Sequence, residues 1–235
     1  MSLIKRFSDG LYRFNQSIRF RGTSEYWEKR YQKGGTSGSG SFERLAQFKA
    51  EVLNRFVQGH KVASVLEFGC GDGNQLALAA YPFYIGLDVS QKAISLCHER
   101  HKNDPTKSFF LYDAHAFFDN AGLFSADLTI SLDVIYHLVE DDVYHLYMTH
   151  LFSCSRKNVI IYSSNHDEYG RSTAHHVRHR HFSPWVESHC PDYALIEKIR
   201  NRYHYDLNSA HNTSFSDFYI YEKRSQKNSG DHEST

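Results

Sequence analysis

Short apolar runs alternate with amphipathic stretches through the middle of the chain. The runs that fit buried strands cover residues 63–68, 83–88, 108–112, 126–132 and 157–163, and the stretches with helical spacing cover 74–80, 90–101 and 139–152. Strands that alternate with helices pair in parallel, and helices then cover both faces of the sheet. The pattern therefore predicts an α/β fold, in which ligands bind at the carboxyl ends of the strands where the strand order reverses.

Three glycines at alternate positions, Gly69, Gly71 and Gly73, follow the first predicted strand, and Glu67 precedes them. Glycine has no Cβ, so it accepts positive φ and lets a ligand lie against the backbone. The N-terminus of a following helix also offers unpaired N–H donors. A dinucleotide fingerprint would need its third glycine at position 74, where the chain has Asn74. The turn therefore predicts a ligand-binding corner but does not favour NAD.

The stretch from Glu67 to Gly73 resembles motif I of the class I S-adenosylmethionine (SAM) methyltransferases. This resemblance implies a Rossmann-like, seven-stranded, mostly parallel sheet with helices on both faces and an antiparallel last strand. It also implies SAM as the cofactor. Two further apolar runs, residues 193–203 and 214–223, are the candidates for the remaining strands.

Acidic residues follow three of the later strands. Asp88 is placed to accept hydrogen bonds from both hydroxyls of a ribose; the alternative is that it starts the next helix, but Ser90 is better placed as that N-cap. The resemblance puts Asp113 near the adenine amino group, against the alternative of a solvated loop acid, and Asp133 near the methionine end of the cofactor. The predicted cofactor-binding residues are Tyr26, Trp27, Tyr31, Glu67, Gly69, Cys70, Gly71, Asp88, Val89, Asp113, Ala114, Asp133 and Val134.

An aromatic segment, residues 26–31, and a glycine-serine loop, residues 34–41, precede a helical pattern over 42–56 that has Ser41 as its candidate N-cap. Composition alone fits a flexible linker. Too little chain precedes the loop to form a domain, so we expect residues 23–41 to close over a ligand as a flap. The resemblance agrees, because such a segment forms part of the cofactor lid in small class I methyltransferases.

Two stretches are candidates for binding the acceptor. Tyr136 and His137 follow Asp133, and the resemblance puts them near the transferred methyl group, although His137 fits a satisfied core histidine equally well. The loop after the fifth strand is rich in arginine and histidine, which predicts an anionic acceptor because guanidinium pairs with phosphate or carboxylate; a solvated basic loop is the alternative. The substrate-binding candidates are Tyr136, Arg171, His175, Arg178 and Arg180.

A hydroxyl acceptor needs a base, and a histidine suits that work. The catalytic candidates are His137, His176 and His179. The histidine spacing matches no common zinc pattern, so we expect no metal site.

Composition limits the partners and the compartment. Lysine plus arginine equal aspartate plus glutamate at 27 each, so no overall field attracts nucleic acid. Four scattered cysteines, with no signal-like or membrane-spanning apolar run, predict a cytoplasmic protein with free thiols. Residues 1–22 have a basic amphipathic pattern that fits a helix packed on the domain or on a second subunit, or peripheral association with a membrane.

We expect N-terminal helices and a lid in residues 1–60, a methyltransferase core in 61–223 and a disordered tail in 224–235. The aromatic segment, the glycine-serine loop and the His-Val-Arg-His-Arg stretch loosely resemble bacterial methyltransferases of surface-polysaccharide pathways. The expected function is therefore SAM-dependent methyl transfer to an oxygen of a small or glycan-like, anionic acceptor. A SAM-binding protein without catalysis and an N- or nucleic-acid methyltransferase are the alternatives.

Overall fold

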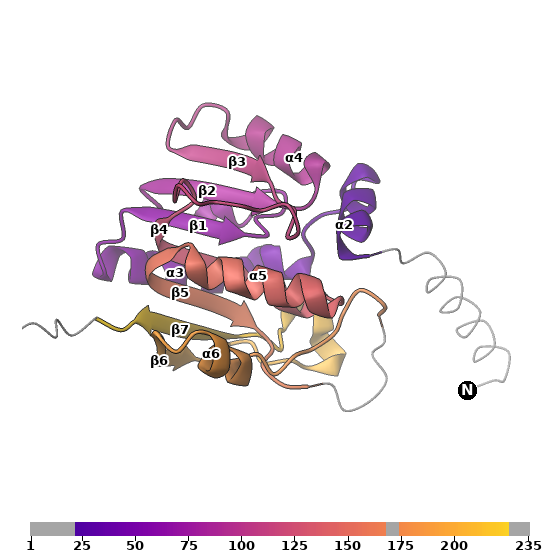
Figure 1. Ribbon diagram of the computed structural model, residues 1–235. Coiled ribbons are helices and arrows are strands. Elements are labelled where there is room, and N and C mark those ends of the chain that lie inside the picture. Colours follow the sequence, from indigo (N-terminus) through magenta and orange to yellow (C-terminus); the bar gives the residue numbers. More distant parts are fainter. Residues whose placement is uncertain (1–21, 168–173, 226–235) are drawn as a thin grey trace, which may run out of the picture.

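The computed structural model describes residues 22–167 and 174–225. One seven-stranded sheet crosses this part of the chain in the order β3-β2-β1-β4-β5-β7-β6. The strands are β1 (Ser64–Phe68), β2 (Phe83–Asp88), β3 (Lys107–Leu111), β4 (Ala126–Leu132), β5 (Ser155–Ser163), β6 (Tyr193–Ile199) and β7 (Asp217–Lys223). β7 runs antiparallel to both of its neighbours and the other pairs are parallel (Figure 1). The predicted seven-stranded α/β sheet with an antiparallel last strand is confirmed.

The order of the strands reverses at β1. The chain goes from β1 outward to β2 and β3, then returns to place β4 on the other side of β1. The connections that follow β1 and β4 therefore leave in opposite directions, which opens a crevice above their carboxyl ends. Gly69 follows one of these ends and Asp133 the other.

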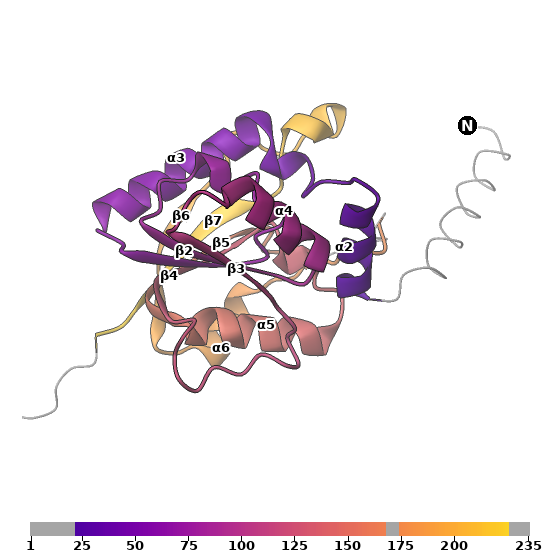
Figure 2. The same ribbon diagram turned by 90° about the horizontal axis from the view of Figure 1, so that it is seen from above.

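Helices cover both faces of the sheet. They are α2 (Thr23–Gln32), α3 (Glu43–Gly59), α4 (Gln91–His101), α5 (Asp141–Ser153) and α6 (Ser183–His189). Seen from above, α3 and α4 lie over one face, and α5 and α6 lie over the other (Figure 2). Successive residues of a strand point to opposite faces, so Val65 packs in the core under α3, whereas Leu66 packs in the core under α5.

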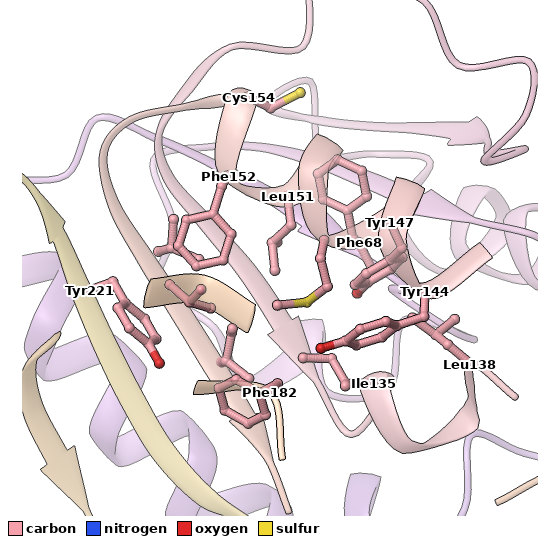
Figure 3. Packing of buried hydrophobic residues seen from close by; sticks show 14 of the residues in the cluster. Phe68, Ile135, Leu138, Tyr144, Tyr147, Leu151, Phe152, Cys154, Phe182 and Tyr221 are labelled. Atoms are coloured by element: carbon pink, nitrogen blue, oxygen red, sulfur yellow. The ribbon is translucent and has the colours of Figure 1, made fainter. Parts of the chain in front are cut away.

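The core under α5 is rich in aromatic side chains (Figure 3). Tyr147, Leu151 and Phe152 of α5 are at most 2% exposed, and they pack with Phe68 of β1 and Tyr221 of β7. Phe68 meets Tyr147 edge to face, with ring centroids 5.6 Å apart. Such rings bury a large apolar area, which fixes α5 beside the end of β1.

The helix α3 belongs to the same core as the sheet. Its apolar stripe, which includes Phe48, Leu53 and Phe56, is buried against strands β1, β4, β5 and β7. Residues 43–59 thus form one unit with the strands, although the predicted division put them in the N-terminal segment. Ser41 is not the N-cap of α3; it lies in a short 3-10 turn, and Phe42 takes the cap position without a side-chain hydrogen bond.

The predicted helix at 74–80 is wrong, because only a 3-10 turn, Leu76–Leu78, forms there. Asn54 of α3 holds this short connection: its Nδ2 donates to the Leu78 carbonyl, and its Oδ1 accepts from the Ala80 N–H. Pro82 then prevents a helix from continuing. The helices expected at 42–56, 90–101 and 139–152 are present as α3, α4 and α5, whereas α2 and α6 had not been predicted as helices.

Two predicted features lie almost wholly outside the described residues: the amphipathic pattern of residues 1–22, of which only residue 22 is described, and the disordered tail of 224–235, of which only 224 and 225 are described. Within the described ranges, none of the helices has the length and apolar character needed to cross a bilayer.

Candidate active site

A pocket opens above the carboxyl ends of β1, β2 and β4, where the reversal of strand order predicts a ligand site. Twelve of the thirteen predicted cofactor-binding residues line it, and Tyr26 is the exception. His137 lines it too. Residues of the pocket that had not been predicted are Thr23, Ser24, Ser37, Ser41, Lys49, Gln75, Tyr112, His115, Leu132, Leu138, Val143 and Tyr147.

The glycine turn forms the floor of this pocket. Gly69 and Gly71 have φ of 81° and 60°, the left-handed region that favours glycine. A Cβ at Gly69 would overlap the side chain of Val134, and one at Gly71 would overlap the Ser37 hydroxyl. The turn therefore excludes other residues by conformation and by contact.

Asp88 anchors the glycine turn to the end of β2. Its carboxylate is 7% exposed, and it accepts hydrogen bonds from the backbone N–H groups of Gly71 and Ser90, both at 2.9 Å. Burial raises the pKa of Asp88 to about 6, and the two N–H donors oppose that rise. Each carboxylate oxygen has a further lone pair for a hydroxyl of a ligand. Ser90 is the N-cap of α4, as predicted, because its hydroxyl accepts from Ala93 N–H.

Glu67 is a second buried carboxylate in the pocket wall. It is 4% exposed, and its Oε2 accepts a 2.6 Å hydrogen bond from the hydroxyl of Tyr84. Burial raises the pKa of Glu67 to about 7, although the Tyr84 hydrogen bond and the charge of Lys49 act in the opposite direction. Together with Asp88, it gives the pocket two acids that bind protons more tightly than usual.

Lys49 and Asp133 form an ion pair at the pocket wall. The lysine side chain is 1% exposed, and its Nζ lies 2.8 Å from Oδ2 of Asp133. The other carboxylate oxygen accepts from the Ser216 hydroxyl at 3.0 Å. Asp133 has φ of 59°, a strained conformation that these bonds hold in place. A lysine between Leu45 and Leu53 on the apolar stripe of a predicted helix was the available sequence signal for this site.

Gln75 supplies an unpaired acceptor in the same pocket. The residue is 8% exposed, and its amide nitrogen donates to the Ala46 carbonyl at 3.1 Å. Its Oε1 has no hydrogen-bond partner among the described residues. A buried polar atom without a partner costs free energy, so this oxygen suits a donor from a bound molecule.

The flap segment is docked over the pocket. Glu28 of α2 accepts from the Ser90 hydroxyl at 2.6 Å, and Ser37 exchanges two hydrogen bonds with Asp72 of the glycine turn. The ring of Tyr31 is buried, and its hydroxyl pairs with Ser37 at 3.0 Å. These contacts connect residues 23–41 to the ends of β1 and β2, and the closing of this segment over a ligand stays a prediction.

Asp113 and Ala114 follow β3 at the rim of the pocket, beside His115. His115 lies with Nε2 3.1 Å from a carboxylate oxygen of Asp142, the second residue of α5. Asp113 is mostly exposed, with 66% of its side-chain surface accessible. The rim at this side of the pocket is therefore polar and open.

His137 has a defined tautomer. Its Nδ1 lies 2.8 Å from the backbone carbonyl of His176, and because a carbonyl only accepts, Nδ1 carries the proton. The lone pair is then on Nε2. Burial lowers the pKa of His137 to about 4, so the ring is neutral at physiological pH. The ring contacts Trp27 edge to face at 4.9 Å between centroids.

The other histidine candidates and Tyr136 do not line the pocket. His176 lies behind His137, and the two rings stack 5.5 Å apart. The Nδ1 of His179 pairs with the Ser164 hydroxyl at 2.7 Å, and burial lowers the pKa of His179 to about 4. Tyr136 is 9% exposed and packs between His137 and His179. His175 is exposed outside the pocket.

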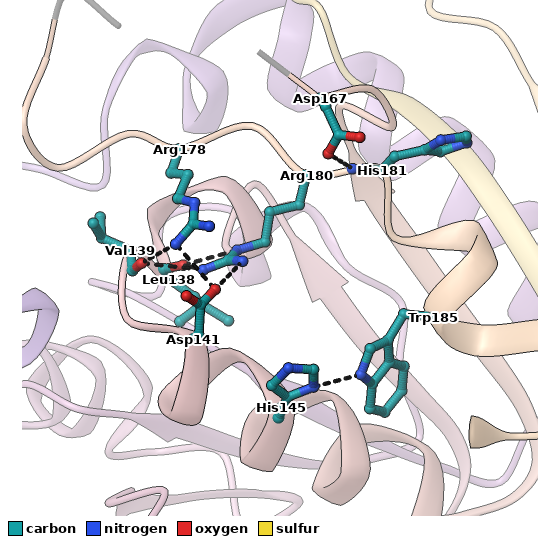
Figure 4. Close-up of polar contacts among 9 residues, drawn as sticks. All are labelled: Leu138, Val139, Asp141, His145, Asp167, Arg178, Arg180, His181 and Trp185. Atoms are coloured by element: carbon teal, nitrogen blue, oxygen red, sulfur yellow. Dashed lines mark hydrogen bonds and ion pairs between the residues drawn. The ribbon is translucent and has the colours of Figure 1, made fainter. Parts of the chain in front are cut away.

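The arginine candidates are held by internal contacts (Figure 4). Arg178 and Arg180 both bind Oδ1 of Asp141, at 3.0 and 2.7 Å, and Arg180 also donates to the carbonyls of Leu138 and Val139. Neither arginine lines the pocket. Their guanidinium groups stabilise a loop instead of facing a ligand. Arg171 lies outside the described residues.

Among residues 22–167 and 174–225, no cluster of three or more His, Cys, Asp or Glu side chains is arranged to hold a metal ion.

Comparison with known proteins agrees with this geometry. A family model described as a methyltransferase domain matches residues 41–218. No curated protein sequence matches the chain.

Solved structures share the fold at low sequence identity. A SAM-dependent methyltransferase from Anabaena variabilis ATCC 29413 has a TM-score of 0.64 and 17% identity, over 86% of this chain and 93% of that one. The N-methyltransferase NodS from Bradyrhizobium japonicum WM9, in complex with S-adenosyl-L-homocysteine (SAH), has a TM-score of 0.57 and 16% identity, over 75% and 86%. Magnesium protoporphyrin IX methyltransferase from Synechocystis PCC 6803 with bound SAH has a TM-score of 0.56 and 16% identity, over 76% and 83%.

The raised pKa of Glu67 can be tested through the pH dependence of the free energy of unfolding. A carboxyl whose pKa is higher in the folded state stabilises the fold below the pKa of the unfolded chain, and that stabilisation is lost as pH rises through about 7. Glu67→Gln should therefore stabilise the ligand-free protein at pH 8, by about 1–3 kcal/mol, and have little effect near pH 4. Urea unfolding at the two pH values measures this. The exposed Glu99→Gln is the control, and a Glu67→Gln effect of equal size at both pH values would contradict the buried charge.

Proposed function

The chain belongs to the methyltransferase-domain family, and from this premise we propose that it transfers a methyl group from SAM to an oxygen of a small acceptor. The observation that carries the proposal is that the glycine turn, Asp88, Asp113, Asp133 and His137 all line the same pocket. These residues come from the ends of different strands, and the fold brings them together where such sheets bind ligands.

The residues of the pocket fit SAM. Asp88 offers charged acceptors for the two ribose hydroxyls, and Asp113 lies at the rim for the adenine amino group. Gln75 offers its unpaired oxygen to the ammonium group, and Lys49 offers its charge to the carboxylate. The sulfonium of SAM supplies a methyl group that is already activated, so the protein mainly has to align the acceptor, which can contribute ~7–11 kcal/mol.

His137 is the base in this proposal. The Nδ1–H bond to the His176 carbonyl leaves the Nε2 lone pair on a ring that lines the pocket. A neutral imidazole in this tautomer can take the proton of an acceptor hydroxyl. His176 and His179, the other candidates, do not line the pocket, so the role falls to His137.

The acceptor remains a small hydroxyl compound, with a glycan-like one supported by the sequence resemblance alone. Arg178 and Arg180 give no support to an anionic acceptor in this pocket, since neither lines it and both pair with Asp141. No observation favours a protein that only binds SAM, or one that methylates nitrogen or nucleic acid. The equal numbers of acidic and basic residues weigh against a nucleic-acid acceptor.

Calorimetry with SAH tests the cofactor site. Asp88→Ala should weaken binding at least about tenfold, because two buried hydroxyls would lose a charged acceptor. Asp192→Ala, an exposed acid at the opposite end of the strands, should leave the affinity unchanged. Equal affinities of the wild type and both variants for SAH would show that Asp88 does not bind the cofactor.

The role of Lys49 can be tested by comparing two ligands. Lys49→Met should weaken SAH about tenfold or more but change the affinity for 5′-methylthioadenosine little, because the latter lacks the amino-acid group. Adding Asp133→Asn removes the carboxylate that Lys49→Met leaves without its cation, and so controls for destabilisation. If both ligands lose the same affinity, Lys49 acts through the fold and not through the carboxylate.

His137 makes a prediction about pH. With methyl-labelled SAM and a hydroxyl acceptor taken from a panel of sugars and phenols, His137→Gln should lower kcat by ~10²–10⁴. Protonation of His137 removes its lone pair, so the part of the wild-type kcat that depends on His137 should fall only below about pH 5, following a pKa of about 4. Any change near pH 6 or 7, where Asp88 and Glu67 titrate, should be the same in the wild type and in His137→Gln. His60→Gln, an exposed histidine beyond α3, is the control. An unchanged kcat in His137→Gln would exclude His137 as the base, and an acidic limb near pH 6.5 that His137→Gln abolishes would contradict its lowered pKa.

A further inference from the structure

The histidine-arginine stretch at 174–181 is hydrogen-bonded to the turn that carries His137. Arg178 donates its backbone N–H to the Tyr136 carbonyl at 2.7 Å. The side chains of Arg178 and Arg180 converge on Asp141, at the start of α5 (Figure 4). We name Asp141, Arg178 and Arg180 the Asp141 clamp.

Within the Asp141 clamp, Arg180 is the buried member and makes several contacts besides the ion pair, whereas Asp141 and Arg178 are largely exposed. The side chain of Arg180 is 11% exposed, and its guanidinium lies 4.4 Å from the centre of the Tyr144 ring. It also makes hydrogen bonds of 3.0–3.2 Å to the carbonyls of Leu138 and Val139. A planar guanidinium with several acceptors fixes both chain segments in one relative position.

That position determines the partner of His137. The carbonyl of His176, two residues before Arg178, meets Nδ1 of His137 at 2.8 Å. The imidazole rings of His137 and His176 are also parallel within 13°. A hydrogen bond at one ring nitrogen decides which nitrogen keeps the lone pair, so the loop fixes both the tautomer and the tilt of the ring.

Helix α2, which belongs to the predicted flap (residues 23–41), contacts both His137 and His176. Tyr26 of α2 stacks on the ring of His176, with ring centroids 4.2 Å apart and an interplanar angle of 13°. Thr23, at the start of α2, donates its N–H to a carboxylate oxygen of Glu140 at 2.9 Å. Its hydroxyl lies 2.9 Å from the backbone carbonyl of His137 and 2.6 Å from the other Glu140 oxygen, and its one proton can be donated to either of them. The lid helix therefore touches both members of the hydrogen bond.

We propose that the Asp141 clamp and Tyr26 are positioning residues, which hold the His176 carbonyl on Nδ1 of His137 and so keep its Nε2 as the proton acceptor. This rests on the proposed role of His137 as the base. In this arrangement, docking of the lid and alignment of the base are one event, because Tyr26 contacts His137 through His176.

NMR spectroscopy of histidine-labelled protein tests the proposal without any acceptor. Correlation of ring protons with ring nitrogens distinguishes an Nδ1–H from an Nε2–H imidazole, and the spectrum of His137→Gln assigns the signals. The wild type should show one tautomer, with the proton on Nδ1. Asp141→Asn and Tyr26→Leu should move the Nδ1 signal toward the position of an averaged pair of tautomers.

Two matched variants serve as controls. Asp142→Asn removes the neighbouring acid of the same helix turn, which pairs with His115 outside the clamp. Tyr26→Phe keeps the stacked ring and removes only the hydroxyl. Both should keep the wild-type tautomer.

The outcomes separate this proposal from the proposed function. An Nε2–H tautomer in the wild type, or a wild-type tautomer retained in both Asp141→Asn and Tyr26→Leu, would overturn the positioning role. If Asp141→Asn does not fold, the Tyr26 pair of variants decides. SAH binding is measured in parallel: its absence in the wild type would contradict the proposed function and leave the tautomer result standing.

Discussion

One buried carboxylate connects the parts of this structure on which the site depends. Asp88 ends β2, and its two oxygens accept the N–H groups of Gly71 and Ser90, so it fixes the glycine turn and the start of α4 in one contact. Removing this carboxylate from water costs free energy, and the raised pKa of Asp88 reflects that cost. A group that is costly to the free protein and still offers lone pairs to a ligand is typical of a binding site.

Other charged side chains of the pocket are also buried. Glu67 is buried with one hydroxyl donor, and Lys49 is buried against Asp133. Buried ion pairs rarely stabilise a protein more than apolar residues of similar size would. Their position around one pocket, next to the unpaired oxygen of Gln75, is better explained by a polar ligand than by stability of the fold.

The basic stretch after β5 illustrates how composition can mislead. Arginines near an expected acceptor site favour an anionic ligand, but Arg178 and Arg180 pair with Asp141, an acid of the same chain that begins helix α5. Charge in a sequence gives no indication of which partner the fold will supply. This pairing holds the loop whose His176 carbonyl contacts Nδ1 of His137.

The sequence by itself determined the sheet and most of the pocket floor, because strand periodicity, glycines at positive φ and acids at strand ends are local features. It did not determine the connection after the glycine turn, where Asn54 of α3 stabilises a 3-10 turn in place of a helix. Nor did it pair Lys49 with Asp133 or His137 with the His176 carbonyl. Those contacts join residues distant in the chain, and only the packing of α3, the lid and the loop after β5 against the sheet brings them together.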